Sequence, residues 1–168
     1  DGDERSVDRG EDLGQRDLVG RAGGSWLVNL VGGMKRGTVA PMWLLGNASP
    51  EQDIAEARAK EAEGFHFFKL KIGVKPIAAD IATTRAVRAA LPDTPLCADA
   101  NCGLTPALAR RYLDGTRKAD LLFVEQPLAH DDLAGVKQLA RASKTPIGAD
   151  EGIHSLADIE AHARAGAC

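Results

Sequence analysis

Short apolar runs alternate with longer alanine-rich segments from Thr38 to the end of the chain. Each longer segment has a polar face, as a helix packed on a sheet has. The apolar runs are residues 39–45, 65–72, 96–98, 121–124 and 147–149. The segments with helical character are about 51–63, 76–91, 106–114, 131–143 and 156–165. Strands that alternate with helices at this spacing predict βαβ units and a parallel sheet.

Three of the predicted helices begin with capping residues. Ser49 is followed by a proline and, three residues on, by Gln52, which is the pattern of a capping box with a proline in the first turn. Thr105 before Pro106 repeats the cap and the proline. Ser155 with Asp158 resembles a further capping pair. These signals support the helical interpretation of the longer segments.

Two architectures use this alternation: a doubly wound sheet and a (β/α) barrel. A doubly wound or flavodoxin-like ligand domain needs a phosphate loop after an early strand, and Gly46-Asn47 is followed by no glycine pattern. Barrel active sites instead lie at the carboxyl ends of the strands, where this chain repeatedly places polar residues. The predicted fold is α/β, a partial TIM-type (β/α) barrel of about five βα units with a parallel sheet.

The N-terminal part differs from the rest. We expect residues 1–16 to form a disordered charged tail, because nine of them are charged and glycines interrupt any helical pattern. Residues 17–37 contain a short apolar stretch, 26–31, closed by two glycines, and are expected to form a lead-in helix and loop. Residues 38–168 then form the partial barrel domain.

Composition narrows the class of protein. The chain has 168 residues, of which 44% are hydrophobic and 27% charged, as in a soluble globular protein. A net charge of −3 favours neither nucleic acid nor an anionic membrane as partner, and no apolar run is long enough to span a bilayer. The three cysteines have no zinc-site spacing, and their odd number argues against a disulfide framework. We therefore expect a cytoplasmic protein.

Two lysines stand in the second apolar run. Lys69 and Lys71 are two residues apart on a predicted strand, so their side chains project from the same face. Inside a barrel, desolvation and like-charge repulsion would lower a lysine pKa, so that one of the two could act as a base near neutral pH. The alternative is an edge strand that carries two solvated lysines.

Acidic residues follow the next three apolar runs. Asp99, Glu125 and Asp150 each stand just after a strand-like segment. Any one of them could be a helix cap or a loop ion pair. Three in register would converge, because parallel strands lie about 4.8 Å apart. Converging anions need a cation, and oxygen ligands suit Mg²⁺ or Mn²⁺.

The ordered set of motifs resembles the muconate-lactonizing branch of the enolase superfamily. The set consists of Lys-Leu-Lys, Asp-Ala-Asn, Glu-Gln-Pro and Ala-Asp-Glu, with steps of 28, 26 and 25 residues from Lys71 to Asp99, Glu125 and Asp150. Each tripeptide alone is a weak signal, but the order and spacing match the family's layout of one motif per strand. The resemblance covers about Asp17 to Ala167.

The resemblance implies a function and a role for each motif residue. Asp99, Glu125 and Asp150 would bind Mg²⁺ or Mn²⁺. Lys71 would be the base, and Lys69 would help to lower its pKa. The reaction would be metal-dependent abstraction of a proton α to a carboxylate through an enediolate, of cycloisomerase, racemase or dehydratase type, on a small carboxylate substrate. The residues expected to support the ligands or face the substrate are Asn101, Gln126 and Glu151.

The length of the chain limits this expectation. A barrel of this kind takes about 250 residues. In 168 residues we expect neither the sixth strand, where the resemblance places a second lysine, nor the N-terminal capping domain. We therefore expect either a chain truncated at both ends or a chain whose open sheet edges pair with another copy in a homo-oligomer. The alternative function is that of a non-catalytic, self-associating barrel fragment that at most binds a divalent metal.

Overall fold

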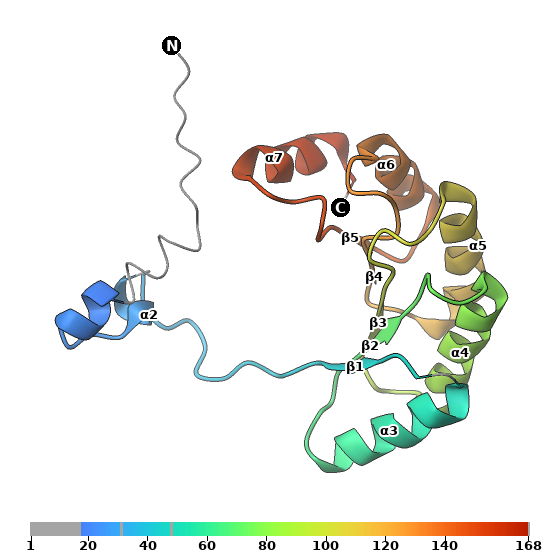
Figure 1. The fold of residues 1–168 in the computed structure, drawn as a ribbon, viewed down its shortest axis with the longest axis horizontal. Coiled ribbons are helices and arrows are strands. Elements are labelled where there is room, and N and C mark those ends of the chain that lie inside the picture. The colour runs from blue at the N-terminus through green and yellow to red at the C-terminus, as the bar shows by residue number, and fades with distance from the viewer. Residues whose placement is uncertain (1–17, 31, 48, 168) are drawn as a thin grey trace. The chain divides into compact units, whose positions relative to one another are not determined.

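The computed structural model (Figure 1) describes residues 18–30, 32–47 and 49–167. The chain divides into two compact units, Asp1–Val39 and Ala40–Cys168. In the first unit residues 18–22 are helical and α2 spans Leu27–Leu30. The charged tail predicted over residues 1–16 lies outside the described residues. Within the described part of the chain, no helix combines the length and apolar character needed to cross a membrane.

The second unit is built on one parallel sheet of five strands. The strands lie side by side in chain order, and each neighbouring pair runs parallel. This confirms the predicted α/β architecture with one helix between successive strands. The strands are β1 (Trp43–Leu45), β2 (Phe68–Lys71), β3 (Leu96–Asp99), β4 (Val124–Glu125) and β5 (Ile147–Gly148).

The helices begin at the residues that the capping patterns predict. Ser49 accepts a hydrogen bond from the Gln52 amide at 3.3 Å, and the Gln52 side chain accepts one from the Ser49 amide at 3.3 Å. The Thr105 and Ser155 hydroxyls accept the N–H groups of Leu108 and Asp158. The helical elements are α3 (Pro50–Ala62), α4 (Ile77–Ala90), α5 (Pro106–Thr116), η1 (Arg117–Ala119), α6 (Leu133–Ala142) and α7 (Leu156–Ala165).

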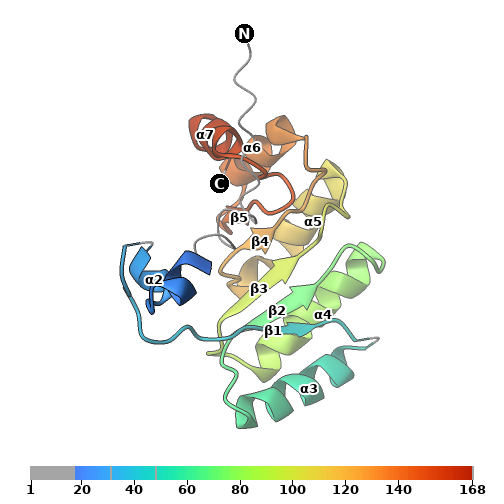
Figure 2. The same cartoon turned by 60° about the vertical axis from the view of Figure 1, so that its left-hand side comes forward.

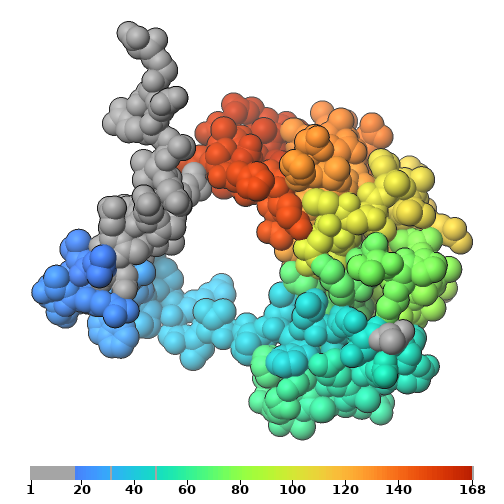
Figure 3. Space-filling model, in the orientation of Figure 1, coloured from blue at the N-terminus to red at the C-terminus, as the bar shows by residue number. Residues whose placement is uncertain are grey.

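Helices α3 to α6 cover one face of the sheet (Figure 2). The alternation of side chains along β2 shows the consequence, since Phe68 and Leu70 are buried and the two lysines between and after them are only partly buried. On β3 all four residues are buried. In the space-filling view, the segments from α3 to α7 pack against one another in chain order (Figure 3). One face of the sheet therefore forms the core, and the other carries the polar side chains of β2 together with Leu44 and Cys97.

Four strands, β1, β2, β4 and β5, are shorter than the apolar runs predict. β1 begins only at Trp43, because Pro41 has no N–H to donate to the ladder. β4 begins only at Val124 and ends at Glu125, just before Gln126 and Pro127. The acidic residues of the motifs stand at the last residue of β3 and β4 and in the loop after β5.

Candidate functional site

Three of the predicted site residues share one level of the sheet. Lys71 is the register partner of Asp99, and Asp99 is the register partner of Glu125. Paired residues on parallel strands project to the same face, and neighbouring strands lie about 4.8 Å apart. A lysine and two carboxylates therefore start from adjacent positions at the carboxyl end of the sheet.

The lysine-bearing strand is an inner strand of the sheet. β2 pairs with β1 on one side and with β3 on the other. The side chain of Lys69 is only 15% exposed. The alternative of an edge strand with two solvated lysines is therefore wrong.

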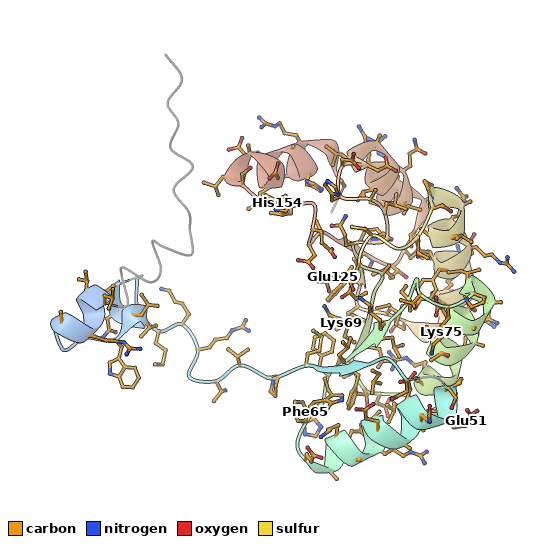
Figure 4. The ribbon with its side chains drawn as sticks, in the orientation of Figure 1. Glu51, Phe65, Lys69, Lys75, Glu125 and His154 are labelled. Carbon is orange, nitrogen blue, oxygen red and sulfur yellow. The ribbon has the colours of Figure 1, made fainter. Side chains whose placement is uncertain are left out.

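Lys69 lies between the two carboxylates. Its ammonium nitrogen is 2.5 Å from Glu125 Oε2 and 3.5 Å from Asp99 Oδ2 (Figure 4). Burial opposes the charge of Lys69, but the hydrogen bond to Glu125 and the charges of Glu125 and Asp99 outweigh it and raise the lysine pKa. Of the two lysines, Lys69 is thus not the one whose pKa is lowered, because the hydrogen bond and the opposite charges act on it more strongly than desolvation does.

The second lysine has different surroundings. Among the described residues, the Lys71 ammonium makes no hydrogen bond or ion pair. Its charge acts on Glu151, whose pKa it helps to lower. The structure thus separates the two lysines into one that is anchored by carboxylates and one that is not.

The third acidic residue lies beyond the shared level. Glu125 pairs with Gly148, so Asp150 comes two residues after the partner position, past the end of β5. Its side chain is exposed, and the chain turns there with a hydrogen bond from the Ile153 amide to the Asp150 carbonyl. The expectation of three carboxylates in register is therefore met by two and is wrong for Asp150. In the described part of the chain, no three acidic, histidine or cysteine side chains converge on a metal position.

Asn101 connects two of the loops at this end of the sheet. Its backbone N–H donates to Asp99 Oδ1 at 2.9 Å, and its side-chain amide donates to Glu151 Oε1 at 2.9 Å. The hydrogen bond from Asn101 is the main cause that lowers the pKa of Glu151. Asn101 therefore orients one predicted metal ligand and keeps a neighbouring carboxylate ionised.

Gln126 is enclosed in the protein. It is only 2% exposed, and both ends of its side-chain amide are occupied by backbone groups. A buried side chain bonded in this way is turned toward the backbone of the loops. Of the two roles that the family resemblance allows, these contacts favour support of the neighbouring loops.

Sequence reasoning missed two buried aspartates at the same end of the sheet. Asp53 Oδ1 accepts the Asn47 amide at 2.9 Å in the loop after β1. Asp80 Oδ2 accepts the Gly73 amide at 2.9 Å in the loop after β2, and burial raises its pKa. Both residues stand in the first turn of a helix, where acidic residues are common, so the sequence carries no further signal for them.

The donor set fits a hard divalent cation. Asp99 and Glu125 already direct carboxylate oxygens at one cationic group, the Lys69 ammonium. Asp150, on the next loop, would complete three carboxylates, and oxygen-only ligands suit Mg²⁺ or Mn²⁺. A metal ion bound here would neutralise the charge of the carboxylates in place of the Lys69 ammonium.

Comparison with known proteins identifies relatives of the second unit. The family described as "Enolase C-terminal domain-like" matches residues 52–168. Muconate cycloisomerase 1-2 of Acinetobacter lwoffii is 37% identical over 145 residues, which are 83% of this chain and 37% of that protein. L-Ala-D/L-Glu epimerase of Bacillus subtilis is 36% identical over 130 residues, or 76% of this chain and 35% of the epimerase.

A solved structure has the same fold. The mandelate racemase/muconate lactonizing family protein from Azoarcus sp. EbN1 superposes with a TM-score of 0.86 and 38% sequence identity. The superposition covers 94% of this chain and 42% of that protein. The chain therefore spans less than half the length of the proteins that it matches.

Proposed function

The chain belongs to the enolase C-terminal domain-like family, and on that basis we propose that its site removes a proton from the carbon next to a substrate carboxylate. The cofactor would be Mg²⁺ or Mn²⁺, held by Asp99, Glu125 and Asp150. The observation that carries the proposal is the shared level of Lys71, Asp99 and Glu125 at the carboxyl end of the sheet. This arrangement supports the proposal, because a lysine would lie next to a pair of carboxylates that could bind a cation.

Removal of such a proton needs both a metal ion and a proton acceptor. A proton next to a carboxylate is weakly acidic, because its removal gives a doubly charged enediolate. A bound divalent metal ion would supply positive charge that stabilises this dianion. The proton itself must go to a group on the protein: the substrate C–H bond breaks, an N–H bond forms on a neutral lysine, and the electron pair stays on the substrate.

We assign the base to Lys71. Its ammonium group makes no hydrogen bond with the described residues, so none of these holds it away from a substrate. Lys69 is bound to Glu125 and Asp99, and its pKa is raised, which keeps it charged and unsuited to accept a proton. Lys69 instead balances the two carboxylates.

The substrate is proposed to be a small carboxylate. The names of the two relatives refer to muconate and to a dipeptide that ends in glutamate, and both compounds carry carboxylates. A cycloisomerase, an epimerase and a dehydratase can share one proton-abstraction step and differ in their later steps. The proposal therefore concerns the shared step.

Exchange of the α-proton with solvent tests this function. The chain is incubated in D₂O with Mg²⁺ and, in turn, an alanine–glutamate dipeptide and a muconate-derived lactone. We expect deuterium at the carbon next to the carboxylate in one of the two, and none when EDTA removes the metal. An absence of Mg²⁺-dependent exchange with both compounds would contradict the proposal.

A further inference from the structure

Gln126 joins three loops at the carboxyl end of the sheet. Its backbone N–H donates to the Gly148 carbonyl at 2.9 Å, and its carbonyl accepts the Cys102 amide at 2.8 Å. Its side-chain Oε1 accepts the amides of Asp150 at 2.9 Å and Gly152 at 3.0 Å. These bonds connect the ends of β3, β4 and β5 through one residue.

Both ends of the Gln126 side-chain amide are hydrogen-bonded within the protein. The Nε2 group donates to the Leu128 carbonyl at 3.1 Å, which orients the amide so that Oε1 points at the turn after β5. The residue is 2% exposed, so water does not compete for these hydrogen bonds. An amide is suited to this position because it presents a donor and an acceptor at once.

The backbone of Gln126 is strained. Its φ angle is 34°, in the left-handed region, although it is not glycine and precedes Pro127. Such a conformation is unfavourable for a residue other than glycine and persists only where the surroundings impose it. Bonds to Gly148, Cys102, Leu128, Asp150 and Gly152 impose it here. The strain is explained if the side chain must reach the turn after β5.

We infer that Gln126 is a positioning residue that holds the turn at residues 150–152 and thereby places Asp150 toward Asp99 and Glu125. The inference rests on the proposed function for the role of Asp150 as a metal ligand. Asp150 lies two residues past the end of β5, where no strand pairing fixes it. The bond from the Asp150 amide to Gln126 Oε1 therefore takes the place of the missing ladder contact.

Two readouts on the full chain test the inference. In Gln126→Leu, we expect hydrogen exchange at the Asp150 and Gly152 amides of the metal-free chain to be about tenfold faster. We also expect the dissociation constant for Mn²⁺, measured by electron paramagnetic resonance, to rise by about 10–100-fold. Gln126→Glu retains the acceptor oxygen but loses the donor to the Leu128 carbonyl, so we expect amide exchange slower than in Gln126→Leu and faster than in the wild type.

Thr84→Val is the matched control. Thr84 is fully buried and bonds to Tyr112 and to the Asp80 carbonyl, away from the turn after β5, so this variant also loses buried hydrogen bonds. It is expected to change neither readout at the site. The positioning role is overturned if Gln126→Leu leaves the two amides as protected as in the wild type. It is also overturned if Mn²⁺ affinity stays unchanged in a chain that binds the ion.

The two proposals fail in different ways. Faster amide exchange in Gln126→Leu, together with no Mn²⁺ binding by the wild type, would support the tie between Gln126 and the turn. The same result would overturn the proposed metal-dependent function. The amide measurement therefore tests the positioning role without relying on the metal.

Discussion

Lys71→Ala is expected to reduce Mg²⁺-dependent α-proton exchange by about 100-fold to 10,000-fold, the usual contribution of a positioned general base. Lys71 stands level with Asp99 and Glu125 and makes no hydrogen bond with the described residues. Its removal therefore takes away the proton acceptor and leaves the two carboxylates in place. The measurement is the rate of deuterium incorporation, followed by mass spectrometry.

Lys71→Arg shows whether charge or basicity matters at this position, and Lys118→Ala serves as the control. Lys71→Arg keeps the positive charge, but a guanidinium does not lose its proton, so exchange is expected to fall as far as in Lys71→Ala. Lys118→Ala, at an exposed lysine in η1, is expected to leave the rate unchanged. Exchange by Lys71→Ala within threefold of the wild-type rate would remove Lys71 from the role of base.

Lys69→Met is expected to destabilise the metal-free chain by about 3 kcal/mol, as breaking a buried ion pair does. The Lys69 ammonium lies 2.5 Å from Glu125 Oε2, and the side chains of Lys69, Asp99 and Glu125 are 10–18% exposed. Without Lys69 the two carboxylates would repel each other with no cation between them. Urea unfolding at pH 7 measures the loss, and Lys118→Met is the control, with a change below about 0.5 kcal/mol.

The ion pair of Lys69 and Glu125 also makes the stability of the wild-type chain depend on pH. The folded pKa of Lys69 is raised above its ordinary value of 10.5. The stability that the pair contributes is therefore fully present below pH 10.5 and is lost as the pH rises through the folded pKa. Lys69→Met should lack this alkaline loss. An equal loss in both proteins would show that another group causes it.

Magnesium is expected to restore much of the stability lost in Lys69→Met. A ligand that binds only the folded chain stabilises it by about 2.7 kcal/mol at 100 times its dissociation constant. In the wild type the ion must first displace Lys69, so we expect a smaller gain there. Equal gains in the two proteins would contradict the idea that Lys69 occupies the place of the metal ion.

The strand order and the helix starts could be predicted from the sequence because local chemistry determines them. Ser49 and Gln52 form the capping box that their spacing predicts, and Thr105 caps its helix before Pro106. The pattern also predicts that Asp99 and Glu125 lie side by side, since each is the last residue of its strand. These features depend on neighbours in sequence or on simple strand pairing.

Other features of the site depend on contacts that no local pattern reveals. The strand β5 ends at Gly148, so Asp150 is two residues past the level of the other carboxylates. The bonds from Gln126 to the turn after β5 join residues 24 and 26 positions apart. The pKa of Lys69 is raised by a hydrogen bond to Glu125, which is 56 residues away in sequence. No sequence pattern indicates this close contact.

Binding of Mn²⁺ to the chain tests the central claim most directly, because it asks whether the strand-end carboxylates form a metal site. Electron paramagnetic resonance should show one bound Mn²⁺ per chain, with affinity lowered at least about 100-fold in Glu125→Gln. Glu63→Gln, at an exposed acid after α3, should bind as the wild type does. An absence of saturable binding, or equal affinity in Glu125→Gln, would contradict the account.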